Sequence, residues 1–204
     1  MVTFSVPEKL DQQSPGSNVF SFTLETCNLL IAGSRNLTVD AKITSLLLQA
    51  FASLDFSFMT GCANGVDKSF KKALALSPYK DRCFIACAFK ARVNSAYGLY
   101  ASKVVPDGLP PKVALYRRTL WMVKRCSMAL LFPIDPLTGL WGKGSRLVFN
   151  SSMFQLKPVF VVSDKAHYKT DYYKVVPSSL FGIVKGYWAV PYPISKGGTC
   201  DEVF

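Results

Sequence analysis

Histidine is almost absent from the sequence, and its cysteines are not spaced for metal binding. His167 is the only histidine among 204 residues, and none of the six cysteines belongs to a C-x-x-C pair. A structural zinc site takes four Cys or His ligands, usually in closely spaced pairs, so we expect no metal. Because several cysteines lie inside apolar runs, we expect reduced and buried thiols, as in a cytoplasmic protein.

Long apolar runs are also missing. The apolar run at residues 28–32 is strand-sized, whereas a membrane-spanning helix needs about 20 apolar residues. The N-terminal segment carries Pro7, Glu8, Asp11 and Pro15 where a secretory signal peptide has its apolar region. We therefore expect a cytoplasmic protein without a membrane partner.

Acidic residues are scarce relative to basic ones. The chain has 13 Asp and Glu against 24 Lys and Arg, which gives a net charge of +11. Because half of the residues are hydrophobic and only 18% are charged, disorder is excluded as the main state. The excess charge predicts attraction to polyanions such as nucleic acids or nucleotide phosphates. Most of it lies in residues 82–146, with eleven basic side chains against Asp107 and Asp135.

Short apolar runs alternate with helical periodicity along the chain. Strands are expected at residues 28–32, 56–60, 82–89, 127–133 and 158–163. Helices are expected at residues 40–54, 64–76, 112–125 and 144–156. Strands that are nearly continuous apolar runs between helices are typical of a parallel sheet covered on both faces. We therefore predict a Rossmann-like, doubly wound α/β fold with a mainly parallel sheet of about five to seven strands.

The length favours a single domain over residues 1–204. We divide it into a core, an N-terminal lead-in and a C-terminal extension, at residues 28–163, 1–27 and 164–204. Residues 90–111 form a long connection rich in Gly and Pro, of a kind that is often functional or mobile. The extension is rich in Tyr, Val and Pro, and it predicts an edge strand near residues 182–190.

Three of the predicted strand-to-helix turns contain glycine. In open α/β sheets, ligands bind beyond the carboxyl ends of the strands, where helix N-termini offer free N–H groups to anions. The turns are Gly33-Ser34-Arg35, Gly61-Cys62-Ala63-Asn64-Gly65-Val66-Asp67 and Gly142-Lys143-Gly144-Ser145-Arg146. Together they predict a phosphate cradle. Taken singly, each has a plainer explanation, because glycine is common in turns, Ser34 can cap a helix and Asp67 can favour a helix dipole.

The order of these motifs resembles the SLOG superfamily. The resemblance covers roughly Asn28 to Ser163 and rests on the three turns, on Arg118-x-x-x-Met122 before an apolar strand, and on the apolar strand Pro158-Val159-Phe160-Val161-Val162. SLOG domains are Rossmann-like and include DprA, the LOG phosphoribohydrolases and the YspA-like proteins, and the YspA-like branch is the most similar in motif order and spacing. By contrast, the sequence has neither G-x-G-x-x-G nor G-x-x-x-x-G-K-[ST], so a dehydrogenase fingerprint and a P-loop are both absent.

The resemblance implies a ligand and a set of residues that line its site. SLOG members bind nucleotides or nucleotide-derived signals, some act as sensors in defence and mobile-element conflict, and DprA-like members bind single-stranded DNA. With the turns, the resemblance predicts a site for a nucleotide or ADP-ribose-like ligand lined by Gly33, Ser34, Arg35, Gly61, Ala63, Asn64, Gly65, Asp67, Arg118, Gly142, Gly144 and Ser145.

Two departures from the family pattern weaken an enzymatic reading. Where the family often has Arg-Asn, this chain has Arg118-Thr119. LOG enzymes carry a catalytic glutamate after the third turn, whereas this chain has Val148 three positions after Ser145 and no acid within residues 142–156. Glycosidic cleavage needs such a carboxylate. Asp67 remains a weak catalytic candidate, and whether the protein is an enzyme stays open.

Three functions are therefore weighed. The first is a non-catalytic domain that binds a nucleotide or a nucleotide-derived ligand. The second is a DprA-like protein that binds single-stranded DNA or RNA, with Tyr97 and Tyr100 stacking on bases and with the basic residues Arg92, Lys103, Arg117, Lys143 and Arg146 on the backbone. The third is a LOG-like nucleotide phosphoribohydrolase. The sequence leaves the ligand's identity and assembly into homo-oligomers open.

Overall fold

The computed structural model describes residues 28–164 and 172–192. Its helices are α1 (Ala41–Ser53), α2 (Val66–Ala75), α3 (Pro111–Arg125) and α4 (Lys143–Phe154), with short 3-10 helices η1 (Lys80–Arg82) and η2 (Lys90–Ser95). Its strands are β1 (Asn28–Gly33), β2 (Ser57–Gly61), β3 (Cys83–Cys87), β4 (Ala101–Lys103), β5 (Met128–Phe132), β6 (Val159–Val161), β7 (Tyr173–Leu180) and β8 (Val184–Pro191).

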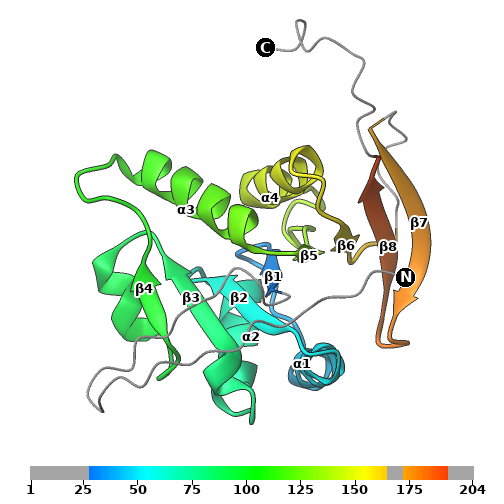
Figure 1. The fold of residues 1–204 in the computed structure, drawn as a ribbon, viewed down its shortest axis with the longest axis horizontal. Helices are drawn as coiled ribbons and strands as arrows, with labels where there is room; N and C mark the ends of the chain where they lie inside the picture. Colours follow the sequence, from blue (N-terminus) through cyan, green and yellow to red (C-terminus); the bar gives the residue numbers. More distant parts are fainter. Residues whose placement is uncertain (1–27, 165–171, 193–204) are drawn as a thin grey trace, which may run out of the picture.

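The strands form one sheet in the order β4-β3-β2-β1-β5-β6-β8-β7 (Figure 1). The first six strands in this order run parallel to one another. The last two, β8 and β7, join in antiparallel fashion. The predicted Rossmann-like α/β fold with a mainly parallel sheet is confirmed. Within the described residues the sheet has eight strands, slightly more than the predicted five to seven.

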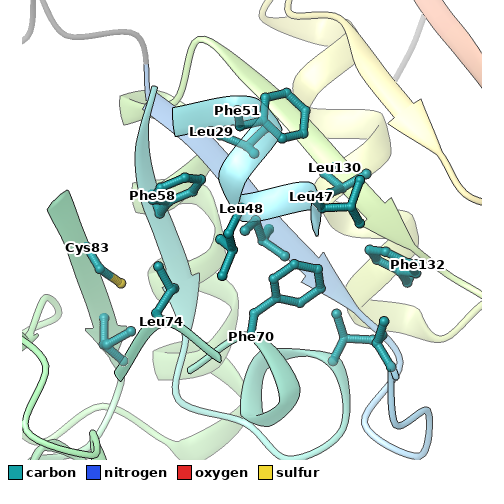
Figure 2. Close-up of a cluster of buried hydrophobic side chains, with 14 of the residues drawn as sticks. Leu29, Leu47, Leu48, Phe51, Phe58, Phe70, Leu74, Cys83, Leu130 and Phe132 are labelled. Carbon is teal, nitrogen blue, oxygen red and sulfur yellow. The ribbon is translucent and has the colours of Figure 1, made fainter. Parts of the chain in front are cut away.

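Side chains on the strands alternate between two hydrophobic layers, one on each face of the sheet. In β1, Leu29 and Ile31 face one layer while Leu30 and Ala32 face the other, as the period of two requires. Figure 2 shows the first layer, in which α1 and α2 pack on the sheet through Leu47, Leu48, Phe51, Phe70 and Leu74. On the opposite face α3 packs against α4, and both lie on the sheet. The sheet is therefore covered on both faces.

Local residue chemistry explains where the helices begin. Asp40 accepts hydrogen bonds from the backbone N–H groups of Lys42 (2.8 Å) and Ile43 (3.2 Å), so it is the N-cap of α1 rather than the first residue of the helix predicted at residues 40–54. Pro111 is the first residue of α3, where its missing N–H costs no helical hydrogen bond.

Two segments differ from the sequence-based expectation. The long connection at residues 90–111 contains η2 and the short strand β4, which pairs with β3 through Ile85 and Ala101. The extension contributes a hairpin of two strands, β7 and β8, instead of one edge strand near residues 182–190. Phe181 and Gly182 form its turn with φ of 53° and 71°, as hairpin turns require. The lead-in at residues 1–27, His167 and Tyr168 lie outside the described residues.

The topology places three of the strand-to-helix turns together. β1 lies between β2 and β5. The strands that follow it first in the sequence, β2 to β4, lie on one side of β1, and the later strands, β5 to β8, lie on the other. In open α/β sheets, ligands generally bind at such a switch point, beyond the carboxyl ends of the strands. In the part of the chain that the structure describes, no helix is both long enough and apolar enough to cross a bilayer.

Candidate functional site

The turns that follow β1, β2 and β5 contact one another through the backbone. The N–H of Val66, after β2, donates to the carbonyl of Ser34 at 3.1 Å, and the N–H of Ser34 donates to the carbonyl of Phe132 at 2.9 Å. The side-chain amide of Asn36 donates to the Asp135 carboxylate at 2.8 Å. The third turn begins at Gly142, whose N–H donates to the carbonyl of Pro133, next to Phe132, at 3.4 Å, so all three predicted turns lie near the carboxyl ends of β1, β2 and β5.

In the first two turns, packing alone accounts for the glycines. A Cβ on Gly33 would lie 2.6 Å from the Val66 Cγ2 atom and would also strike the Phe132 carbonyl. Gly65 has a φ of +67°, and a Cβ there would lie 2.5 Å from the Arg35 carbonyl carbon and oxygen. These glycines let the two turns pack together, so their presence does not by itself indicate a ligand.

A buried ion pair fixes the second turn against α3. The Asp67 carboxylate accepts the Ala63 N–H at 3.1 Å and lies 3.9 Å from the Arg118 guanidinium. Both residues are 6% exposed, and a Cβ on Gly61 would collide with both side chains. Burial raises the pKa of Asp67, whereas Arg118 and the Ala63 N–H act in the opposite direction. Asp67 thus holds the turn in shape, and one of its oxygens is already engaged by Ala63.

The third turn, at the N-terminus of α4, has a different character. Gly142 is the N-cap, no side chain caps the helix, and no acidic residue lies in its first turn. A Cβ on Gly144 would meet nothing within 4 Å, so packing within the described residues does not require glycine there. Ser145 is 3% exposed, and its hydroxyl is buried without a hydrogen-bond partner among the described residues. Free N–H groups at a helix N-terminus favour an anion.

Two basic side chains flank this helix N-terminus. Lys143 and Arg146 are both exposed, on either side of Gly144 and Ser145. A phosphate at this position would meet backbone N–H groups, one hydroxyl and two exposed basic side chains. The arrangement can bind a phosphate group, and α4 itself contributes no carboxylate to it.

The loop between β5 and α4 joins the site and was not singled out in the sequence. Ile134 and Trp141 pair across it, and Asp135 accepts the N–H groups of Leu137 and Gly139. Because Asp135 also binds Asn36, the loop is tied to the first turn. The pattern Asp-Pro-x-Thr-Gly is a turn signal that would have located the loop, although not its partner.

The two residues that depart from the family pattern, Thr119 and Val148, are both buried. Thr119 stands where the resemblance leads one to expect Asn, and it is 7% exposed, with its hydroxyl donating to the Leu115 carbonyl at 3.0 Å. Val148 is 3% exposed and packs in the second hydrophobic layer. The Thr119 hydroxyl is thus already engaged, and Val148 has no polar group to offer a ligand.

The basic residues predicted for nucleic acid do not form one compact patch. Arg92 follows β3, Lys103 ends β4 beside Asp107, and Lys143 and Arg146 follow β5. These four share the carboxyl edge of the sheet. β4 lies four strand intervals from β5, or about 19 Å at the usual strand spacing. The fifth residue, Arg117, lies exposed on α3.

The two tyrosines predicted to stack on bases already have partners. Tyr97 lies over the ammonium of Lys71, with 5.7 Å between the nitrogen and the ring centre. Tyr100 packs on Phe84, with 5.5 Å between the ring centres. Each tyrosine keeps 45% of its surface exposed.

Other candidate groups are few within residues 28–164 and 172–192. No three His, Cys, Asp or Glu side chains in these ranges are grouped to hold a metal. Cys62, Cys83, Cys87 and Cys126 are buried free thiols. His167, Cys27 and Cys200 lie outside these ranges.

Comparison with known proteins gives similarity in structure but not in sequence. No protein-family model matches the chain, and a search of curated proteins finds no significant match. DNA processing protein A from Helicobacter pylori, studied for its single-stranded DNA binding mode, matches with a TM-score of 0.53 and 18% identity over 77% of this chain and 82% of that one. DNA processing protein A from Streptococcus pneumoniae matches with a TM-score of 0.54 and 17% identity, over 70% of this chain but 52% of that one.

At these identities the likeness concerns the fold. It confirms the predicted resemblance to DprA at the level of the fold, whereas membership of the SLOG superfamily and of its YspA-like branch stays a prediction. The chain thus has the Rossmann-like α/β fold of DNA processing protein A.

Proposed function

We propose that this protein binds a nucleotide or a nucleotide-derived ligand, such as an ADP-ribose-like molecule, and holds its phosphate at the N-terminus of α4. One observation carries the proposal: the Ser145 hydroxyl is buried without a partner among the described residues, at a helix start that has no cap and no acid. An unpaired buried hydroxyl costs stability unless something binds it. A phosphate oxygen satisfies the hydroxyl and the free N–H groups together.

The other two turns shape the rest of the site. The Ser34 N–H donates to Phe132 at the end of β5, and Asn36 binds Asp135 in the loop between β5 and α4, so Ser34 and the exposed Arg35 lie close to the loop that leads into the third turn. The ion pair between Asp67 and Arg118 fixes the second turn. We propose a binding function without turnover, because Asp67 is engaged in holding this turn and α4 offers no carboxylate. A sensing role in mobile-element conflict and a cytoplasmic location belong to the same proposal.

A matched pair of serine variants tests this function. Ser145 and Ser152 lie on the same helix, and both have buried hydroxyls without a partner among the described residues. Only Ser145 is in the first turn. A hydrogen bond to a charged group contributes about 1.5–3 kcal/mol, so Ser145→Ala should weaken nucleotide binding about ten- to a hundredfold. Calorimetry with AMP, ADP, cyclic nucleotides and ADP-ribose measures the affinities.

The outcome of this pair is decisive. Ser152→Ala should bind the nucleotide as the wild type does. Equal loss in both variants would attribute the effect to the helix as a whole, and unchanged binding in Ser145→Ala would place the phosphate elsewhere. No wild-type binding of any nucleotide in the panel would refute the proposal.

Single-stranded nucleic acid is the second candidate, favoured by the basic residues along the carboxyl edge of the sheet. A strand that follows this edge would pass the α4 N-terminus and reach Lys103 and Arg92, and a protein of the same fold, from Helicobacter pylori, binds single-stranded DNA. Such binding weakens steeply with salt, because each phosphate contact releases counterions. Removing the Lys103 and Arg92 side chains together should reduce the slope of the logarithm of the oligonucleotide binding constant against the logarithm of the salt concentration. The reduction should be almost two, because each lost phosphate contact lowers the slope by about 0.9. The same double variant should leave mononucleotide affinity unchanged.

A further inference from the structure

Two buried cysteines lie at the carboxyl ends of β2 and β3, and the proposed function uses neither. The strand register pairs Gly61 with Ala86, so the next residues along both strands, Cys62 and Cys87, are neighbours as well. Both side chains belong to the hydrophobic layer beneath α1 and α2, so they point to the same face of the sheet. No other cysteines among the described residues occupy neighbouring positions of this kind.

Their backbone positions suit a disulfide. Neighbouring strands lie about 4.8 Å apart, and disulfides join Cα atoms that are about 4.4–6.8 Å apart. Because the two side chains share one face, a bond between them needs rotation of the side chains rather than movement of the strands.

The surroundings make the two thiols unequal. The hydrogen bond from Cys87, together with the nearby Arg118 guanidinium and the Ala88 backbone, lowers the pKa of Cys62 to about 6, against the opposing effects of burial and of Asp67. The same hydrogen bond and burial raise the pKa of Cys87. The lowered pKa favours the thiolate of Cys62, the form that reacts with oxidants, whereas the raised pKa of Cys87 favours its thiol.

We propose that Cys62 and Cys87 form an oxidation site at which a hydroperoxide converts the paired thiols to a disulfide. The Cys62 sulfur attacks one oxygen of hydrogen peroxide, so an S–O bond forms, the O–O bond breaks, and the leaving hydroxide takes up a proton to become water. The Cys87 sulfur then attacks the sulfenic sulfur of Cys62. The S–S bond forms, the S–O bond breaks, and hydroxide leaves as water with the Cys87 proton.

The geometry assigns the order of these steps. Cys62 is 6% exposed in the turn after β2, whereas Cys87 is fully buried inside β3. Peroxide therefore reaches Cys62, and Cys87 resolves the sulfenic acid. The disulfide removes the thiolate charge beside Arg118 and ties the second turn to β3. This inference does not depend on which ligand the site binds.

Peptide mapping of the full chain tests the site. Cys27 and Cys200 are replaced by Ser, the protein is treated with hydrogen peroxide and then unfolded, and the remaining thiols are alkylated. We expect a peptide pair joined through Cys62 and Cys87, with Cys83 and Cys126 fully alkylated. Mapping of the unaltered chain checks that the replacements do not create the bond.

Two single variants separate the steps. Cys87→Ser should stop at a sulfenic acid on Cys62 that dimedone traps, whereas the matched Cys83→Ser variant should form the disulfide as before. Cys83 is a fair control because it lies in β3 on the same face, with its pKa raised by burial to about 12. Alkylation of both Cys62 and Cys87 after peroxide treatment, or a disulfide to Cys83 or Cys126 in their place, would overturn the proposal.

Discussion

Replacing Gly144 with alanine should separate ligand binding from folding. A Cβ at this position meets nothing within 4 Å, and Gly144 lies in the first turn of α4. Alanine is favoured over glycine in helices by up to about 1 kcal/mol, so the free energy of unfolding should stay the same or rise by up to that amount. The added methyl group nevertheless lies where a phosphate must approach the backbone.

The expected loss of binding can be estimated from the contacts that the methyl group blocks. Two hydrogen bonds to a charged phosphate contribute about 3 kcal/mol or more, so the affinity of Gly144→Ala for a nucleotide should fall at least a hundredfold. Urea unfolding and titration calorimetry on the same preparation measure the two quantities. Unchanged nucleotide affinity in Gly144→Ala would refute the assignment of the phosphate to α4.

Gly33→Ala is the matched control, because it should show the reverse. Its Cβ would lie 2.6 Å from the Val66 side chain and would strike the Phe132 carbonyl. Because this carbonyl belongs to the backbone, it cannot move away by a change of rotamer. Overpacking of this kind costs about 1–3 kcal/mol, which lowers the melting temperature by several degrees. A Gly33→Ala protein as stable as the wild type would contradict the packing account of the first turn.

Three further results are expected. Asp67→Asn leaves Arg118 buried without a counter-charge and should lower the free energy of unfolding by about 3–5 kcal/mol, measured in urea; a change below about 1 kcal/mol would mean that the pair does not fix the turn. The alkylation rate of Cys62 by iodoacetamide should level off just above its pKa of about 6, and a rate that still rises above pH 8 would contradict the thiolate. Phe58→Ala removes a fully buried ring from the first hydrophobic layer and should lower the free energy of unfolding by about 3–5 kcal/mol. A loss no larger than that caused by replacing an exposed residue would contradict the packing.

Most of the parallel sheet could be predicted because buried strands carry their own signal. Leu29 to Ala32 form an apolar run that needs both faces covered, and the run ends at Gly33 just as β1 does. By contrast, β4 is three half-buried residues at the edge of the sheet, and Ala101-Ser102-Lys103 shows no apolar pattern to detect. Its strand character comes from pairing with β3, which no local signal contains.

The positions of the turns followed from the sequence, but the reasons for their glycines did not. Gly33, Gly65 and Gly144 look alike in the sequence, and only their neighbours in space distinguish the two packed positions from the open one. The partnership of Asp67 with Arg118 joins residues from α2 and α3, so it depends on the tertiary fold. The neighbouring positions of the paired cysteines depend in the same way on the strand register.

The most direct test of the central claim is a titration followed by two-dimensional amide NMR. When a nucleotide that stabilises the protein is added, we predict that the largest shifts fall on the backbone N–H groups of residues 143–146, with smaller shifts at Ser34 and Arg35. Phosphate-free nucleoside should not shift the α4 amides at the same concentration. Nucleotide-induced shifts that leave residues 143–146 unaffected would contradict the account.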